Sequence, residues 1–147
     1  MSKLLTWVVL ALMPVVARGE GYLCVADMAT GFSYNDGAWR SGGLKASEKY
    51  LVHRSDASGA IGIKAAKWYV SEFGSKSAAA VCYDDFDKSG NLFCKQQDRF
   101  DVDYVDFRMN KNSLRFLYAY LAGYWDREAG TEAGDTPYLA IGRCSPM

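Results

Sequence analysis

Short runs of apolar and aromatic residues, broken by glycine, asparagine, aspartate and serine, follow one another along the chain after residue 20. Runs rich in valine, tyrosine, phenylalanine and tryptophan, bounded by such residues, are typical of strands joined by turns. No segment of this part predicts a secure helix. The expected strands and hairpins lie at 22–28, 31–40, 48–54, 63–74, 78–86, 91–96, 104–126 and 137–144.

This pattern predicts about eight to ten strands, with no internal repeat and no second domain. We expect residues 20–147 to form a single all-β domain, long enough to bury a core. Its strands would form an antiparallel meander, either closed into a small lipocalin-like barrel or folded into a sandwich. Outer-membrane strands alternate lipid-facing apolar and lumen-facing polar residues, a pattern that this chain lacks, so we expect no stable membrane insertion.

The segment 31–40 predicts a hairpin by its turn chemistry. Asp36 and Gly37 can adopt the left-handed conformations that a tight two-residue turn requires. This register places Tyr34 opposite Trp39 as a cross-strand aromatic pair.

The segment 63–74 fits either a helix or a strand. Ile61, Ala65 and Trp68 have helical spacing, and Gly74 would end a helix. The β-branched and aromatic residues at 68–70 favour a strand instead, which is the interpretation that we adopt.

The segment 104–126 predicts a longer hairpin with its turn at 110–113. A four-residue loop there pairs Met109 with Leu114 and Phe107 with Phe116. The second strand is apolar on both faces, which is typical of a strand that is covered on two sides or that curls around an interior. Phe116, Tyr118 and Tyr120 lie on one face, and Leu117, Ala119 and Leu121 lie on the other.

Residues 1–19 have the features of a secretory signal peptide. Lys3 provides a positive charge, and an uncharged, mostly apolar run of 14 residues extends from Leu4 to Ala17. A helix needs ~20 such residues to cross a bilayer, so this run is too short for a good anchor. We expect export to the periplasm or the extracellular space, with cleavage after Ala17 or Gly19.

The charge of the mature chain argues against two classes of partner. The sequence has 17 basic and 17 acidic residues, and removing residues 1–19 takes away Lys3 and Arg18. The remaining net charge of about −2 offers no basic surface for nucleic acid or for anionic lipid.

The chain has 4 cysteines, and an oxidising destination predicts two disulfides. Three pairings are possible. Cys82 and Cys94 flank a turn signal, which favours a bridge within one hairpin and leaves Cys24 to pair with Cys144. That second bridge would join the first strand to the last and favours a closed barrel. A four-thiolate zinc site would need short spacings such as C-x-x-C, which the sequence lacks.

Three stretches, YLCVADMATGFSYN, LRFLYAYLAGYWD and TPYLAIGRC, resemble segments of small exported bacterial proteins that have no assigned function. The resemblance spans most of the mature chain. It implies secretion and a compact domain, and it carries over no catalytic residue.

The stretch CYDDFDKSGNLFC, from Cys82 to Cys94, is similar to a calcium-binding loop. Oxygen-bearing side chains recur at alternate positions from Asp85, and a glycine occupies the sixth position, as in an EF-hand. The twelfth position is Gln96, which cannot supply the bidentate carboxylate that completes a calcium shell. The flanks look like strands rather than helices, so we interpret the stretch as a hairpin and expect no metal site.

Two sets of residues could suggest catalysis. His53, the sole histidine, lies beside Ser55 and Asp56, but the members of a hydrolase triad meet through folding and not through adjacency in sequence. Acidic residues also cluster at Asp84–Asp87. Four more aspartates lie further along, and two of them, Asp101 and Asp103, alternate with Val102 and Tyr104 as in a half-exposed strand. We therefore expect neither a catalytic residue nor a cofactor. These further residues are Asp98, Asp101, Asp103 and Asp106.

Five aromatic side chains could line a cavity for a small apolar ligand, as in other small barrels. The same rings could instead fill the core, and both interpretations stay open. The residues are Trp39, Trp68, Phe116, Tyr118 and Tyr120.

We therefore expect a secreted or periplasmic binding domain rather than an enzyme, with a small apolar molecule as its ligand. One alternative is a protein-binding module, such as an inhibitor of an exported hydrolase, that works through the loop Asp126–Thr136. A second alternative is an enzyme that uses the acidic cluster Asp84–Asp87.

Overall fold

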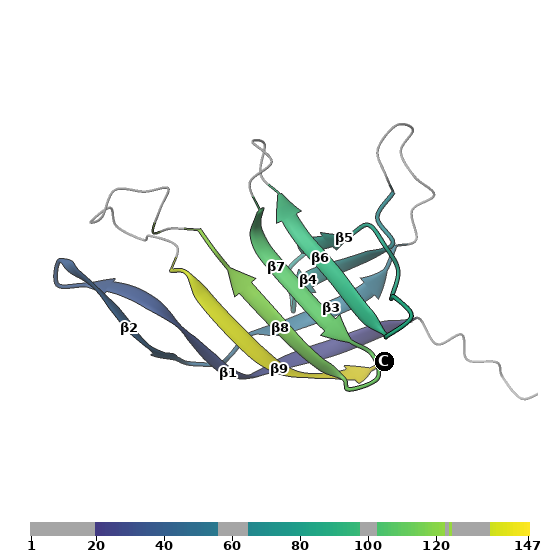
Figure 1. Ribbon diagram of the computed structural model, residues 1–147, viewed down its shortest axis with the longest axis horizontal. Coiled ribbons are helices and arrows are strands. Elements are labelled where there is room, and N and C mark those ends of the chain that lie inside the picture. The colour runs from purple at the N-terminus through teal and green to yellow at the C-terminus, as the bar shows by residue number, and fades with distance from the viewer. Residues whose placement is uncertain (1–19, 56–64, 98–102, 123, 125–135) are drawn as a thin grey trace, which may run out of the picture.

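The computed structural model describes residues 20–55, 65–97, 103–122, 124 and 136–147 (Figure 1). These residues form nine strands and no helix, so none of them belongs to a helix that could span a membrane. The strands are β1 (Gly21–Asn35), β2 (Ala38–Leu44), β3 (Lys49–Arg54), β4 (Trp68–Glu72), β5 (Ala78–Cys82), β6 (Asn91–Gln97), β7 (Asp103–Asn110), β8 (Arg115–Tyr120) and β9 (Tyr138–Pro146).

The strands form one antiparallel barrel. Neighbours along the chain pair in the order β3-β4-β5-β6-β7-β8-β9, and β1 pairs with both β3 and β9, which closes the ring. The predicted meander is therefore confirmed, and the structure selects the barrel over the sandwich. Closure pairs the edges that an open sheet would leave free.

The first strand is longer than its sequence pattern indicates. We expected separate strands at 22–28 and 31–40, but β1 continues for 15 residues without a break. Its first half pairs with β3, and its second half pairs with β2. The β1–β2 hairpin therefore projects beyond the barrel, at the left of Figure 1.

The turn of this hairpin has the predicted chemistry. Asp36 and Gly37 have φ values of 52° and 77°, as a two-residue turn between twisted strands requires. Tyr34 pairs with Trp39, and their ring centroids lie 5.5 Å apart.

Within the ambiguous segment 63–74, residues 68–72 form strand β4, so the strand interpretation is correct there. Ser71 pairs with Leu51 and Val70 with Val52. The helical spacing was misleading because Trp68 and Val70 both face the barrel interior at the two-residue period of a strand. Gly74, with a φ of 87°, lies in the turn after β4.

The hairpin formed by β7 and β8 is confirmed, but its predicted register is wrong by two residues. Met109 pairs with Phe116 and Phe107 pairs with Tyr118. The turn occupies residues 111–114, one position later than expected, and Leu114 ends it with a φ of 54°. A shift of two residues preserves the faces of a strand, so Phe116 and Tyr118 still point inward.

Aromatic rings fill the centre of the barrel. Tyr50 is completely buried and stacks on Tyr118 with 4.7 Å between ring centroids. Phe107 and Phe116 stack on each other at 5.7 Å, and both also contact Tyr50. The Tyr50 hydroxyl lies 3.4 Å from that of Tyr138, so this polar atom has a partner inside the core.

Both predicted disulfides are present. Cys24 and Cys144 are direct partners across the seam between β1 and β9, with 3.9 Å between their Cα atoms. Cys82 and Cys94 join β5 to β6, next to the Val81–Lys95 pair, which is the one ladder pair that these two strands share. Each disulfide therefore links two neighbouring strands of the ring covalently.

The two disulfides should contribute unequally to stability. Cys24–Cys144 closes a loop of 120 residues and Cys82–Cys94 one of 12. Loop-closure entropy then predicts that Cys24→Ala/Cys144→Ala lowers the free energy of unfolding by about 4–5 kcal/mol and Cys82→Ala/Cys94→Ala by about 3 kcal/mol. Denaturant unfolding of the oxidised proteins measures both values. Both variants lose the same buried atoms, so equal losses would contradict the loop-length explanation.

The buried tyrosines should make the barrel sensitive to alkali. Burial raises the pKa of Tyr50 and of Tyr118, and a hydrogen bond to Tyr138 raises both further. The folded barrel retains phenolic protons that the unfolded chain releases, so the free energy of unfolding should fall as the pH rises above the ordinary tyrosine pKa of about 10. Unfolding experiments across this pH range test the expectation. The double variant Tyr50→Phe/Tyr118→Phe should have a flatter profile, whereas Tyr124→Phe, at an exposed position, should keep the parent profile.

Candidate functional site

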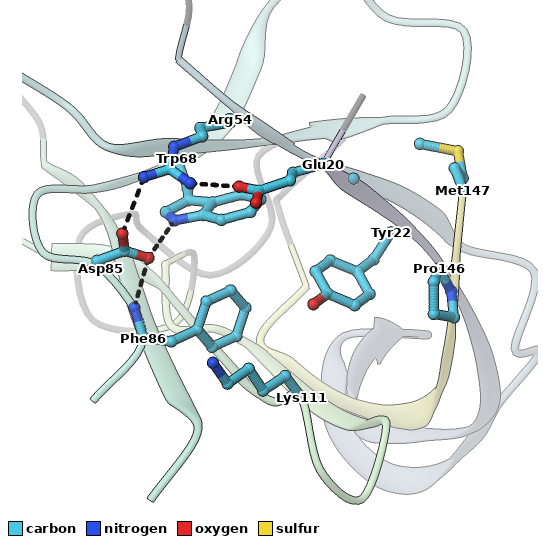
Figure 2. Close-up of a pocket in the computed structure, with 10 residues that line it drawn as sticks. Glu20, Tyr22, Arg54, Trp68, Asp85, Phe86, Lys111, Pro146 and Met147 are labelled. Atoms are coloured by element: carbon cyan, nitrogen blue, oxygen red, sulfur yellow. Dashed lines mark hydrogen bonds and ion pairs between the residues drawn. The ribbon is translucent and has the colours of Figure 1, made fainter. Parts of the chain in front are cut away.

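A cavity of about 430 Å³ lies at one end of the barrel (Figure 2). Six segments that are far apart in sequence meet around it: the starts of β1 and β4, the ends of β3 and β9, and the turns after β5 and β7. The lining residues are Glu20, Gly21, Tyr22, Arg54, Trp68, Asp85, Phe86, Lys111, Pro146 and Met147. We call this space the end cavity.

Three aromatic rings form the apolar wall of the end cavity. Phe86 meets Trp68 edge-on at 5.2 Å and Tyr22 at 5.9 Å, measured between ring centroids. The Tyr22 and Trp68 rings lie 6.3 Å apart. The rings come from β1, β4 and the turn after β5, and Figure 2 shows them grouped around the same space. Tyr22 and Phe86 are half-buried and offer a surface on which a flat apolar group could lie, whereas Trp68 is buried and packs against both of them.

Asp85 organises the polar side of the end cavity. Its carboxylate accepts hydrogen bonds from the Trp68 indole nitrogen at 2.9 Å and from the Phe86 backbone nitrogen at 2.8 Å. The Arg54 guanidinium donates to it at 3.1 Å. These hydrogen bonds, with the nearby cations, hold the pKa of Asp85 below its ordinary value.

Arg54 joins the two acidic residues of the end cavity. Its guanidinium forms an ion pair with Asp85 and a second one with Glu20, and it lies 5.6 Å from the centre of the Trp68 ring. The hydrogen bond to Glu20 raises the pKa of Arg54. The charge of Arg54 is thus already matched by the protein's own carboxylates.

Lys111 is the second cation of the end cavity. It begins the turn between β7 and β8, and its ammonium group lies 5.3 Å from the centre of the Phe86 ring. Within the described ranges no carboxylate forms an ion pair with it. Its charge acts on Asp85 from a distance and helps to lower the pKa of that carboxyl. An anionic group beside the aromatic wall could therefore pair with Lys111 without breaking a close ion pair.

The calcium-like stretch forms the turn beside this cavity. Asp87 accepts hydrogen bonds from the backbone nitrogens of Ser89 and Asn91, both at 2.8 Å. Gly90 has a φ of 82°, and a β-carbon there would lie 2.6 Å from the Asn112 side-chain nitrogen. The alternate oxygens of the motif thus hold a tight turn, and the hairpin interpretation is confirmed. No His, Cys, Asp or Glu residues in the described ranges are grouped as metal ligands would be.

The five aromatic residues that we considered either as cavity lining or as core lie in three places. Phe116, Tyr118 and Tyr120 follow one another along β8 and face the interior, where the first two are buried. Trp68 lines the end cavity. Trp39 lies on the projecting hairpin, where its ring meets that of Tyr124 at 5.4 Å.

Of the residues considered for catalysis, those that the structure describes lie on different elements. His53 is exposed on β3 beside Tyr69, and Asp106 pairs with Arg108 on β7. Asp85 and Asp87 accept hydrogen bonds from the protein itself. Asp56, Asp98 and Asp101 lie outside the described residues, as do 126–135 of the loop considered for protein binding.

Sequence reasoning missed most of the end cavity. Tyr22, Phe86, Lys111 and Met147 carry no motif, and each lies at the end of a strand or in a turn. The one available signal is that alternate strand ends of a closed meander meet at the same rim. Using that signal requires the strand register, which the sequence alone does not provide.

No protein-family model, no curated protein and no solved structure matches this chain.

Removing the Asp85 carboxylate should destabilise the barrel. Trp68 is 3% exposed, so Asp85→Ala leaves a buried indole N–H without its acceptor, at a cost of about 1–3 kcal/mol. The pKa of Asp85 is lower in the folded protein than its ordinary value of 3.8. Its contribution to the free energy of unfolding should therefore be complete above pH 3.8 and be lost as the pH falls through the lower, folded-state pKa. Denaturant unfolding at neutral and acidic pH measures both effects.

Asp85→Asn is the matched control because it keeps an oxygen acceptor for the indole but has no charge. It should cost less than Asp85→Ala at neutral pH. An Asp85→Ala protein as stable as the parent would show that this carboxylate does not organise the site.

Proposed function

We propose that this protein is an exported, non-enzymatic binding domain that holds a small molecule in the end cavity. The ligand would combine a flat apolar body with one negatively charged group. The observation that carries this proposal is an aromatic wall next to Lys111, a cation with no ion-pair partner among the described residues.

The size and lining of the end cavity support a small-molecule site. Its volume of about 430 Å³ falls within the ~300–1,000 Å³ that is typical of such sites. Tyr22, Trp68 and Phe86 supply apolar contact area, and the Met147 thioether can contact an aromatic ring from the opposite side. A few polar groups beside an apolar wall are the usual means of fixing a ligand's orientation.

The interior of the barrel is a weaker candidate for the ligand. Phe116 and Tyr118, which we considered as cavity lining, stack against Phe107 and Tyr50. All four rings are buried, and Tyr50 contacts each of the other three. A ligand inside the barrel would have to displace this packing, at a cost in stability. The end cavity needs no such displacement.

The state of the carboxylates favours binding over catalysis. Asp85 and Asp87 hold their own turn and the Trp68 indole through hydrogen bonds from the protein. Both have a lowered pKa, so they are ionised at neutral pH and are poor proton donors.

Export is part of the proposal. It rests on the signal-peptide pattern of residues 1–19 and on the two disulfides, which persist in oxidising compartments. Amino-terminal sequencing of protein isolated from the cell envelope or the medium would test it. A mature chain that starts at Arg18 or Glu20 is expected.

Ligand charge should matter through Lys111. We expect 2-naphthoate to bind the oxidised mature protein more tightly than its uncharged methyl ester does. The difference should be about fivefold in Kd, the size of an exposed ion pair of ~1 kcal/mol. Lys111→Gln should remove this difference. Calorimetric titration gives the affinities, and the NMR signal of the Trp68 indole N–H reports where the ligand lies.

Lys76→Gln is the matched control because Lys76 is exposed in the turn between β4 and β5, at the opposite end of β4 from Trp68. It should leave both affinities unchanged. Equal binding of acid and ester to the parent protein would refute the proposed role of Lys111. Binding that leaves the Trp68 signal unmoved would refute the end cavity as the site.

A further inference from the structure

The outward side of three neighbouring strands is apolar. β1, β9 and β8 lie side by side (Figure 1), and their registers align the outward residues in rows. One row contains Met28, Ile141 and Leu117, and the next contains Thr30, Leu139 and Ala119. Phe32 of β1 and Leu121, just after β8, continue this surface. We call it the outer apolar face.

The large apolar side chains of the outer apolar face are exposed to solvent as a group. Met28, Phe32, Leu121, Leu139 and Ile141 are between 38% and 65% exposed. Apolar patches larger than a few hundred Å² are uncommon on monomers and typically mark an interaction surface. Of the two explanations for a β8 that is apolar on both faces, the structure shows a strand that curls around an interior, with Leu117 and Ala119 partly exposed on its outward side.

A bulge in β1 creates this alignment. Cys24 and Ala26 face the interior, but the register with β9 shifts between Ala26 and Met28. The extra residue, Asp27, reverses the alternation, so that Met28, Thr30 and Phe32 point outward. Without the bulge these residues would turn toward the core side of the strand.

One end of the outer apolar face is hollow. A cavity of about 600 Å³ lies where the projecting hairpin meets the barrel rim, and it is lined mainly by apolar and aromatic side chains. Such a hollow can receive a bulky apolar side chain, which is how interface anchors usually bind. Its lining residues are Phe32, Trp39, Ser41, Leu121, Tyr124 and Pro137.

The other end is positively charged. Arg115 and Arg143 are direct partners on β8 and β9, and both are exposed. Like charges in this position repel, and an anion between them relieves the repulsion. Arg143 forms an ion pair with Asp27, with 3.8 Å between Nε and Oδ2. Arg115 has no ion pair among the described residues. Arg143 and Pro137 are six positions apart on the chain, so the two ends of the face are ~20 Å apart.

We propose that the outer apolar face binds a segment of another protein about 20 Å long. The segment carries a carboxylate at one end, which pairs with Arg115, and a bulky apolar side chain at the other, which fills the hollow. This surface is separate from the end cavity, and neither proposal depends on the other.

The charge distribution favours a protein segment over two other occupants. An anionic membrane would be bound best by cations along the whole edge of the outer apolar face, whereas Arg115 and Arg143 lie at one end of it. A second copy of this chain would place arginines against arginines if the faces met in parallel alignment, and against the hollow, whose lining has no carboxylate among the described residues, if they met in antiparallel alignment. A hollow at one end and a cationic pair at the other match a directional segment instead.

Selection from displayed random peptides tests this proposal. The probe is a library of peptides of about 16 residues, long enough to span ~20 Å whether extended or helical. Selected peptides should combine an acidic residue at one end with a tryptophan, phenylalanine or leucine at the other. Leu139→Asp should weaken their binding more than tenfold, because it places a charge in the middle of the buried interface.

Charge reversal provides a readout that a folding defect cannot imitate. Arg115→Glu should weaken the acidic peptides about fivefold and should bind tightly those in which lysine replaces the acidic residue. Phe93→Asp is the control for Leu139→Asp, since Phe93 is also an exposed apolar residue but lies on β6, outside this face.

Three results would overturn the proposal. The first is that the selected peptides bind Leu139→Asp as tightly as they bind the parent protein. The second is that the parent protein, but not Leu139→Asp, binds phosphatidylglycerol vesicles while selecting no peptide, which would assign the face to a membrane. The third is a dimer in sedimentation that Leu139→Asp dissociates, which would assign the face to a second copy of the chain.

Discussion

The pairing of β1 with β9 is the constraint on which the rest of the structure depends. These two strands lie at opposite ends of the described chain, and the Cys24–Cys144 bridge joins them at directly opposed positions. Once this seam is closed, the strand ends of the ring are brought to common rims. The end cavity exists because β1, β9 and the turns between the other strands meet at one of those rims.

The same strand also creates the second surface. Before its bulge, β1 contributes Cys24 and Ala26 to the core. After the bulge, Met28, Thr30 and Phe32 point outward beside β9. Because of the one extra residue, Asp27, the same strand packs into the core at one end and carries an apolar outer surface at the other. The two proposed sites lie along the same strand but face different directions, so each can be altered without changing the other.

Polar residues near the end cavity act mainly on the fold. Asp85 holds the Trp68 indole and Arg54, and Asp87 holds the turn that ends at Asn91. Their hydrogen bonds come from the protein, and this leaves Lys111 as the cation with which a ligand can pair. Two members of the acidic cluster, Asp85 and Asp87, thus hold a tight hairpin turn and one aromatic side chain.

The sequence by itself determined the all-β class, the Asp36–Gly37 turn and the approximate places of most strands, because alternation and turn chemistry are local properties of the chain. It also indicated both disulfides, since the Cys82–Cys94 hairpin left one remaining pair. The tertiary structure decided which strand ends share a rim, and so brought together Tyr22, Phe86 and Lys111 from three distant segments. It also decided the β7–β8 register and the bulge at Asp27, which exposes Met28 and Phe32. Register and bulges depend on how all strands close into one ring, a condition that no single segment of the sequence contains.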